Sequence, residues 1–596
     1  MPVNNQWSSR SVSRRTALRG AGAGLAGLAG AALIGCSGGG GGAAKTDAPA
    51  GGSSASVAPG QAKLKPGQTY TGIFPTATEQ DPIKNGKKGG TYKFRIFDSP
   101  HMDFNKILSS TVNTPNDLTK NKLFRLALGA KADAGAINVE GDLVEKYEVA
   151  SNGTQFTLFL NKGVKFHNVA PVMGRVMTSE DVKLSIERYQ AGGVQKDVFA
   201  DVTSVQTPDA NTVVVKLNQP LAEFPKMAAS WSYIDAKELI ADNAYLTRHA
   251  IGTGAFIQDK WTAKEGQEFV RHPDYFEKGM PFLDKVSGKV IDDENVLQSA
   301  FTTENVFNYE AATSDVAKQM LQQAPKAVLF EYKGLQGANV NGFHFQLKNP
   351  KWQDERVRRA FSMAIDRKDW ATARFAEDTA ASGNGYSPGP MPWRALYDKV
   401  PELSSQGPYY QYNPAEATKL LTAAGYSNTK PITAELTAWF ARLDWGEIMV
   451  PALNKLPLIK ATFRQVDNPT AVTLLSARNF QDITNITWGP PAYAVDQTLY
   501  PWYHSKGGLN HSNHADDTMD KLVTAQRQEQ DPKKQKEIWK QAEDRIYDQV
   551  WEVFTPVNFQ RRGLWHNYVM NFRQHGLGSL TTYASHQFRG IWLDQG

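Results

Sequence analysis

The sequence contains a single cysteine, Cys36, among 596 residues. One cysteine excludes an internal disulfide, so a folded body must be stabilised by its hydrophobic cores, which a chain of this length can readily build. The chain also has little net charge. Arg10, Arg14, Arg15 and Arg19 lie at the N-terminus, and subtracting these four charges from the formal +6 leaves +2. Such a balance gives no sign of a nucleic-acid-binding protein.

The common catalytic and metal-binding motifs are missing. There is no Walker loop, no His-Glu-x-x-His and no Cys-x-x-Cys. Residues 385–389 match the serine-hydrolase elbow, but Pro388 has no N–H to offer an oxyanion hole. The densest group of potential metal ligands matches no known metal loop, which favours a polar loop, and comprises His504, His511, His514, Asp516 and Asp517. We therefore expect no metal, no cofactor and no enzymatic activity.

The N-terminus has the features of an export signal. The uncharged stretch 20–35 follows the basic run SRRTALR at 13–19 and ends in small residues. SRRTALR resembles the twin-arginine signal, with Ala17 where phenylalanine is usual, so the Sec route stays open. Residues 33–36 fit the bacterial lipoprotein cleavage pattern. We expect residues 1–35 to be a signal peptide and Cys36 to carry a lipid that anchors an extracytoplasmic body to a membrane, in the periplasm or at the cell surface.

Composition and periodicity divide the remainder. Residues 36–88 are rich in Gly, Pro, Ser and Lys and predict a flexible linker. The body that follows is too long for one core and has no second long apolar segment. Strand-like alternation at 156–160 and 213–217 is interspersed with helical stripes, including one after Thr178 and one that runs from Asn413 to Gly425. This mixture indicates an α/β or α+β architecture.

Five blocks of the body, in order, carry a family resemblance. The first is NVEGDLVEKYEVASNGTQFTLFLNKGVKFHNVAPVMGRVMTSEDVKLSIERYQ at 138–190, and the others lie at 252–286, 355–370, 412–426 and 488–507. Together they resemble the family 5 extracellular solute-binding proteins, the oligopeptide and dipeptide receptors of ABC importers. Five blocks in order are far more specific than any single short motif.

The resemblance implies a fold, a set of boundaries and a set of partners. The fold would be α/β, two-lobed and of the type II periplasmic-binding-protein kind, closing around its ligand. By this resemblance, lobe I holds residues 89–310 with a subdomain at 129–228, lobe II holds 311–559, and 560–596 returns to lobe I. The partners would be a small solute, either an oligopeptide or an oligosaccharide, and the permease and ATPase subunits of an importer. We expect a monomer.

The resemblance also singles out ligand-binding residues. Peptide-binding members read Trp-x-x-Asp where this chain reads Trp488-Gly-Pro-Pro491, so the aspartate that pairs with a peptide ammonium is replaced by a proline. Asp496 could substitute for it, although helix capping is the favoured role. Trp488 and Tyr493 are the first candidates for a place in the cleft, where they could stack on a ligand, and Trp439 and Arg478 come next. Core packing is the favoured role for most of the aromatic residues in these segments.

Two further classes of function stay open. A receptor of the same fold could serve signalling rather than transport, because fold does not fix function. A secreted hydrolase would need carboxylates that only folding brings together. The importer receptor accounts for the signal, the linker and the five blocks together.

Overall fold

The computed structural model describes residues 64–71, 86–106, 110–127, 138–193, 196–230, 232–333, 342–375, 393–397, 401–439, 443–466, 470, 474–475, 477–486, 494–556, 560–571 and 585–595. The predicted signal peptide and Cys36 lie outside these ranges. Among the residues described, no helix is both long and apolar enough to cross a bilayer.

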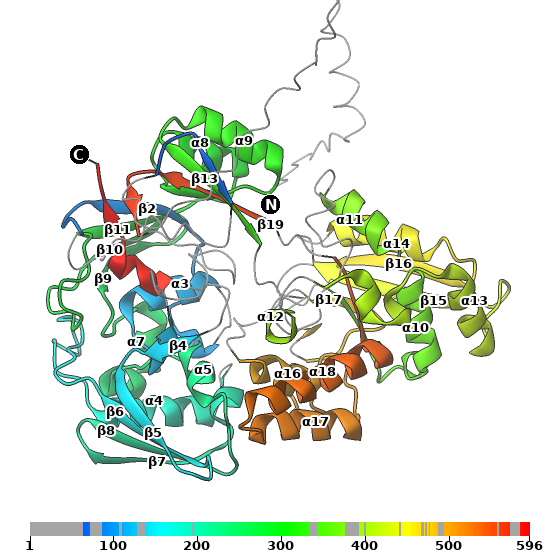
Figure 1. The fold of residues 1–596 in the computed structure, drawn as a ribbon, viewed down its shortest axis with the longest axis horizontal. Helices are drawn as coiled ribbons and strands as arrows, with labels where there is room; N and C mark the ends of the chain where they lie inside the picture. Colours follow the sequence, from blue (N-terminus) through cyan, green and yellow to red (C-terminus); the bar gives the residue numbers. More distant parts are fainter. Residues whose placement is uncertain are drawn as a thin grey trace, which may run out of the picture. The chain divides into compact units, whose positions relative to one another are not determined.

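The first sheet of the body has the order β2-β11-β10-β9 (Figure 1). Its strands are β2 (Thr91–Ile96), β9 (Phe256–Thr262), β10 (Gly266–Arg271) and β11 (Lys285–Val290). Strands β2 and β11 are parallel, and the other two pairs are antiparallel. Beside them, helix α3 (Ser110–Thr119) packs against β9. Gly254 lies so near the end of this helix that a Cβ there would stand 2.3 Å from the backbone carbon of Thr119, so only glycine fits.

A second sheet, β5-β6-β8-β7, contains the strands that the sequence predicts. These are β5 (Val144–Val149), β6 (Gln155–Leu160), β7 (Val202–Asp209) and β8 (Thr212–Leu217). Alternate residues of β6 and β8 are buried, as their patterns predict. Helix α4 (Ser179–Ala191) packs on β7 and β8 and begins with a capping box between Thr178 and Asp181, which confirms the predicted start.

A third sheet, β1-β13-β19-β12, joins distant parts of the chain. Its strands are β1 (Thr69–Thr71), β12 (Asn308–Glu310), β13 (Ala327–Lys333) and β19 (Gln560–His566), with α8 (Glu294–Thr302) and α9 (Ser314–Gln323) beside it (Figure 1). The boundary that we predicted at residue 310 falls inside this sheet, because β13 pairs with β19 along its whole length. The chain stays with the sheet as far as Lys333, since α9 and β13 bury their apolar residues with those of β12 and β19.

Strand β1 corrects the predicted linker. We expected residues 36–88 to be flexible throughout, but Thr69–Thr71 pairs in parallel with β13, and Leu64 and Tyr70 are buried. The ring of Tyr70 stacks on Phe330 at 5.3 Å, and Phe330 stacks on Trp565 at 4.1 Å. Two apolar side chains with partners on neighbouring strands offset the ordering entropy that the average composition of the segment does not.

The fourth sheet has the order β16-β15-β17-β14-β18 (Figure 1). Its strands are β14 (Gly342–Phe345), β15 (Ile432–Trp439), β16 (Ile459–Val466), β17 (Ile483–Ile486) and β18 (Glu552–Phe554). Among the helices that contribute to the same core are α10 (Glu355–Met363), α13 (Pro414–Ala423), α14 (Leu443–Leu453) and α18 (Pro532–Gln549). Helix α13 confirms its prediction, with Asn413 as the N-cap and Gly425 at a φ of 91°.

The remaining elements described are short or lie at the margins of these sheets. They are β3 (Phe124–Leu126), β4 (Val139–Gly141), α5 (Phe224–Ala229), α6 (Lys237–Ala241), α7 (Asn243–Arg248), α11 (Arg367–Phe375), α12 (Trp393–Leu396), α16 (Asp496–Tyr503), α17 (Asp517–Gln528), β20 (Val569–Met570), β21 (Trp592–Leu593) and six 3-10 turns (Phe104–Lys106, Lys196–Phe199, Pro350–Trp352, Leu403–Gln406, Pro408–Tyr410 and Ser585–Gly590).

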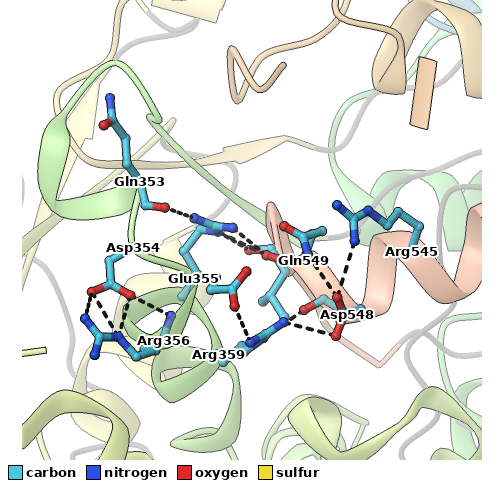
Figure 2. Close-up of polar contacts among 10 residues, drawn as sticks. Gln353, Asp354, Glu355, Arg356, Arg359, Arg545, Asp548 and Gln549 are labelled. Atoms are coloured by element: carbon cyan, nitrogen blue, oxygen red, sulfur yellow. Dashed lines mark hydrogen bonds and ion pairs between the residues drawn. The ribbon is translucent and has the colours of Figure 1, made fainter. Parts of the chain in front are cut away.

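Two arginines join α10 to the end of α18. Arg359 lies between Glu355 and Asp548 (Figure 2), with Nη1 2.7 Å from the first carboxylate and Nη2 3.0 Å from the second. The neighbouring Arg358 is 2% exposed and donates only to backbone carbonyls in the contacts observed. The acceptors are Trp352 at 2.7 Å, Gln353 at 3.0 Å, Gln549 at 2.8 Å and Val550 at 3.2 Å. The last carbonyls of a helix have no hydrogen-bond donor within the helix. The Arg358 guanidinium donates to these carbonyls.

Candidate functional site

One edge of the fourth sheet brings together several segments of interest. Strands β15, β16 and β17 are parallel, so their carboxyl ends lie at the same edge. Strand β14 begins there, because Gly342 pairs with Ile486, and β18 ends there, because Phe554 pairs with Gly342. The carboxyl edge of parallel strands is where open α/β sheets bind ligands.

The predicted stacking residues follow this edge in the sequence. Trp439 is the last residue of β15. Trp488 comes two residues after β17 ends, and it lies outside the described residues, as do Pro491 and Tyr493. The arrangement of the strands therefore brings the end of β15 and the end of β17 to neighbouring positions, while the contacts of these side chains with a ligand stay a prediction.

Arg478 is held by its own backbone and by a nearby loop. It has a φ of 50°, and its carbonyl accepts hydrogen bonds from Gln346 at 3.0 Å and Asn513 at 3.2 Å. Its guanidinium donates to the carbonyl of Gly507 at 3.2 Å. The side chain is half-buried, so it keeps donors available beyond this one bond.

Asp496 is 1% exposed and has close partners on α17. Its two carboxylate oxygens accept from Nε of Arg527 at 2.9 and 3.0 Å, and Gln526 donates to one of them at 2.5 Å. Burial raises the pKa of Asp496, and the charge of Arg527 opposes that rise. The favoured capping role is wrong, because Val495 is the N-cap of α16 and the Asp496 carboxylate is bonded to α17 instead.

Arg527 also reaches a carboxylate from the second sheet. Its Nη1 lies 2.8 Å from Asp201, and its carbonyl accepts the backbone N–H of Ala222 at 3.3 Å. Glu223, the residue before α5, accepts the backbone N–H of Asp496 at 3.2 Å. Burial alone would lower the pKa of Arg527. The negative charges of Asp496 and Asp201 outweigh this effect and raise the pKa.

The histidines of the polar loop have structural partners. His511 accepts or donates at the Leu475 carbonyl, 3.2 Å away, and His514 contacts the Tyr503 carbonyl at 2.9 Å. Burial lowers the pKa of each to about 3. Asp516 caps α17 and pairs with Arg545 at 2.6 Å. Within the described parts of the chain, no three His, Cys, Asp or Glu side chains are grouped in a way that could hold a metal ion.

Sequence reasoning missed Arg527, Asp201 and Glu223. Asp201 pairs with Arg527 and Glu223 with Asp496, in each case across more than 270 residues of the chain, and no local spacing relates them. The only signal available was the pair Gln526-Arg527 at the end of an otherwise amphipathic helix, where polar side chains occupy buried positions. A buried polar pair needs partners, and only the fold can name them.

The four larger sheets, the helices packed beside them and the two crossings of the chain form a mixed helix-and-sheet body with the type II periplasmic binding fold of its structural neighbours. The family model of the bacterial extracellular solute-binding proteins, family 5, matches residues 138–510. The chain therefore belongs to that family. The solved structure of the oligopeptide-binding protein AppA from Bacillus subtilis, in complex with a nonapeptide, has the same fold, with a TM-score of 0.71 and 19% identity over 86% of this chain and 100% of that one.

Curated relatives are similar over shorter stretches. A candidate ABC transporter peptide-binding protein of Brucella ovis is 27% identical over 50% of this chain and 54% of its own length. The heme-binding protein A of Haemophilus influenzae is 26% identical over 49% of this chain and 55% of its own length. The chain thus spans about half the length of these relatives, and their ligands differ from one another.

Proposed function

We propose that the chain is the solute-capturing subunit of an ABC importer, held at the outer face of a membrane and without enzymatic activity of its own. The match of the family 5 model across residues 138–510 carries this proposal. The similarity of the whole body to a peptide-binding protein of the same fold supports it. A permease and an ATPase would be its partners, and the ligand would bind at the carboxyl edge of the fourth sheet.

Direct detection of a ligand tests the proposal. Native mass spectrometry of freshly purified protein should find a small solute that leaves on denaturation. Calorimetry should then show saturable binding of that solute, or of a component of a panel of dipeptides, longer peptides and oligosaccharides. Absence of binding across the panel, with no co-purified solute, would contradict the proposal.

The proposed ligand contacts are Trp488, Tyr493 and Trp439. Arg478 is left out, because its carbonyl is bonded to Gln346, which follows the end of β14 at the opposite edge of the fourth sheet. Asp496 is left out, because its carboxylate is already bonded by Arg527 and Gln526. Aromatic stacking contributes about 0.5 to 1.5 kcal/mol, so Trp488→Ala should weaken binding of the identified solute about twofold to twelvefold. Trp261→Ala, on β9 of the first sheet, is the matched control and should bind normally.

The class of ligand follows from Pro491. A charge-assisted bond to a peptide ammonium is worth about 1.5 to 3 kcal/mol, and proline cannot make it. We therefore propose longer peptides held by backbone contacts, or an oligosaccharide, rather than free dipeptides. Tight dipeptide binding that acetylation of the N-terminus abolishes would show another acid acting as the anchor and would overturn this preference.

The proposed anchor has a test of its own. If a lipid on Cys36 holds the protein to the membrane, Cys36→Ala should move it to the soluble extracellular or periplasmic fraction. Ser37→Ala, which leaves the cysteine in place, is the control. A Cys36→Ala protein that stays with the membrane in high salt would exclude this anchor.

A further inference from the structure

The chain passes twice between two groups of sheets. One side, residues 64–333 and 560–595, contains the first three sheets, and the other side, residues 342–556, contains the fourth. Lys333 and Gln560 are paired partners where the chain leaves the first side, and Gly342 and Phe554 are paired where it meets the second. The two sides are therefore connected covalently at these two crossings. Any other connection between them must come from noncovalent contacts elsewhere.

Such contacts gather around Arg527. Besides the 2.8 Å ion pair with Asp201, Gln528 donates to Gln219 at 3.0 Å and Ala222 donates to the Arg527 carbonyl. Ala494 is fully buried in the core of the second sheet although it lies on the other side of the crossings. We propose that this Arg527 contact is a latch that holds the two sides closed and that opens without unfolding either of them.

The charges of the contact are arranged for separation. When the sides separate, Arg527 stays paired with Asp496, which is on the same side and lies 2.9 Å away. Glu223 keeps Lys226 at 3.1 Å, and Asp201 keeps Gln219, which donates to it at 3.0 Å. Breaking an ion pair inside a protein is costly when it leaves a buried charge without a partner. Separation of the two sides leaves no such charge among these residues. The pair with Asp201 then sets the balance between closed and open forms.

The latch rests on the proposed function in one respect, namely that capture of a solute requires the two sides to open and close. It adds a part of the machinery that no ligand contact supplies. A free protein with this ion pair should spend most of its time closed, and a protein without it should open more often. The distance between the two sides can therefore be measured with no ligand present.

Single-molecule fluorescence energy transfer on the full chain measures that distance. The exposed Lys216 on β8 and Lys533 on α18 are replaced by cysteine for labelling, with Cys36→Ser as background. Asp201→Asn should lower the ratio of closed to open molecules about tenfold, because it removes the negative charge that pairs with Arg527 across the two sides. Asp274→Asn is the matched control, since that aspartate is exposed, on the same side, and pairs only with Lys165 at 3.0 Å in the contacts observed.

Each outcome decides the proposal. A shift in Asp201→Asn alone supports the latch, whereas the same distribution in Asp201→Asn and the parent overturns it, as does an equal shift in Asp274→Asn. Should Asp201→Asn fail to fold, Gln528→Ala removes the exposed bond to Gln219 and should shift the ratio about twofold in the same direction. The fluorescence experiment contains no ligand, so its result is independent of the calorimetric test of solute binding. Failure of the latch and failure of the proposed function can therefore be told apart.

Discussion

The junction of α10 with α18 and the contact around Arg527 both bury an arginine, but the partners differ. Arg358 is bonded to four backbone carbonyls, and burial lowers its pKa to about 10. Arg527 is bonded to two carboxylates, and its pKa is raised. Moving α10 away from α18 would leave a buried guanidinium and the carbonyls of Gln549 and Val550 without partners, whereas Arg527 keeps Asp496 when Asp201 moves away. The first arrangement suits a permanent joint and the second a separable one.

The largest effect should come from removing the permanent joint. Arg358→Met keeps much of the apolar volume but leaves the carbonyls of Trp352, Gln353 and Gln549 without donors, so we expect unfolding to become easier by about 4 kcal/mol. Urea denaturation followed by circular dichroism measures this change. Arg356→Met, on the exposed face of the same helix, should change the midpoint little, and equal midpoints for both variants would refute the joint.

A smaller loss should follow from removing the cation of the latch. Arg527→Gln leaves Asp496 buried without its counter-charge, which should cost about 3 kcal/mol in the free energy of unfolding. Asp201→Asn should cost about 1 kcal/mol or less, because the arginine keeps Asp496. The same denaturation experiment compares them. If Asp201→Asn proved as costly as Arg527→Gln, the two sides would form one inseparable unit.

A buried acid on α18 makes the free energy of unfolding depend on pH. Burial raises the pKa of Glu543 to about 7, against the hydrogen bond from Tyr397 at 2.5 Å. The folded chain thus holds this proton more tightly than the unfolded chain, so its stabilising contribution is complete below pH 4.5 and is lost as the pH rises through 7. Glu543→Gln should match the parent below pH 4.5 and exceed its free energy of unfolding by about 2 kcal/mol at pH 6, part of the way between the two pKa values.

The comparison with the parent is made by urea denaturation at several values of pH. Glu537→Gln, at an exposed position of the same helix, serves as the control and should follow the parent at every pH. A Glu543→Gln protein that loses stability with rising pH as steeply as the parent does would assign the dependence to other groups.

Local patterns were sufficient for some elements. Helix α13 begins at an Asn-Pro pair and is followed by Gly425, so each end is determined by residues next to it. Strands β6 and β8 alternate buried and exposed residues because one face of their sheet is packed. Sequence could predict these parts, since the interactions that form them lie within a few residues.

Other features depend on contacts between distant residues. Tyr70 lies in a strand whose partner, β13, contains Phe330, on which its ring stacks. The composition of residues 36–88 cannot indicate a partner so far along the chain. The partner of Asp496 is likewise decided by α17, which places Arg527 against it. The pairing of β13 with β19, beyond the boundary proposed at residue 310, is likewise a long-range interaction that no local pattern indicates.

Strand β1 has a consequence for how far the protein can search for solutes. If the chain is tethered at Cys36 and the segment before Leu64 is the linker that its composition predicts, pairing of β1 leaves 27 residues between Cys36 and Leu64, instead of the 52 between Cys36 and Gly89. A flexible segment of glycine-rich composition has a root-mean-square reach of about 5.5 Å times the square root of its length, or about 30 Å against about 40 Å. A shorter linker confines the folded body to a thinner layer above the membrane. It thereby raises the effective concentration of the receptor at a permease in the same membrane.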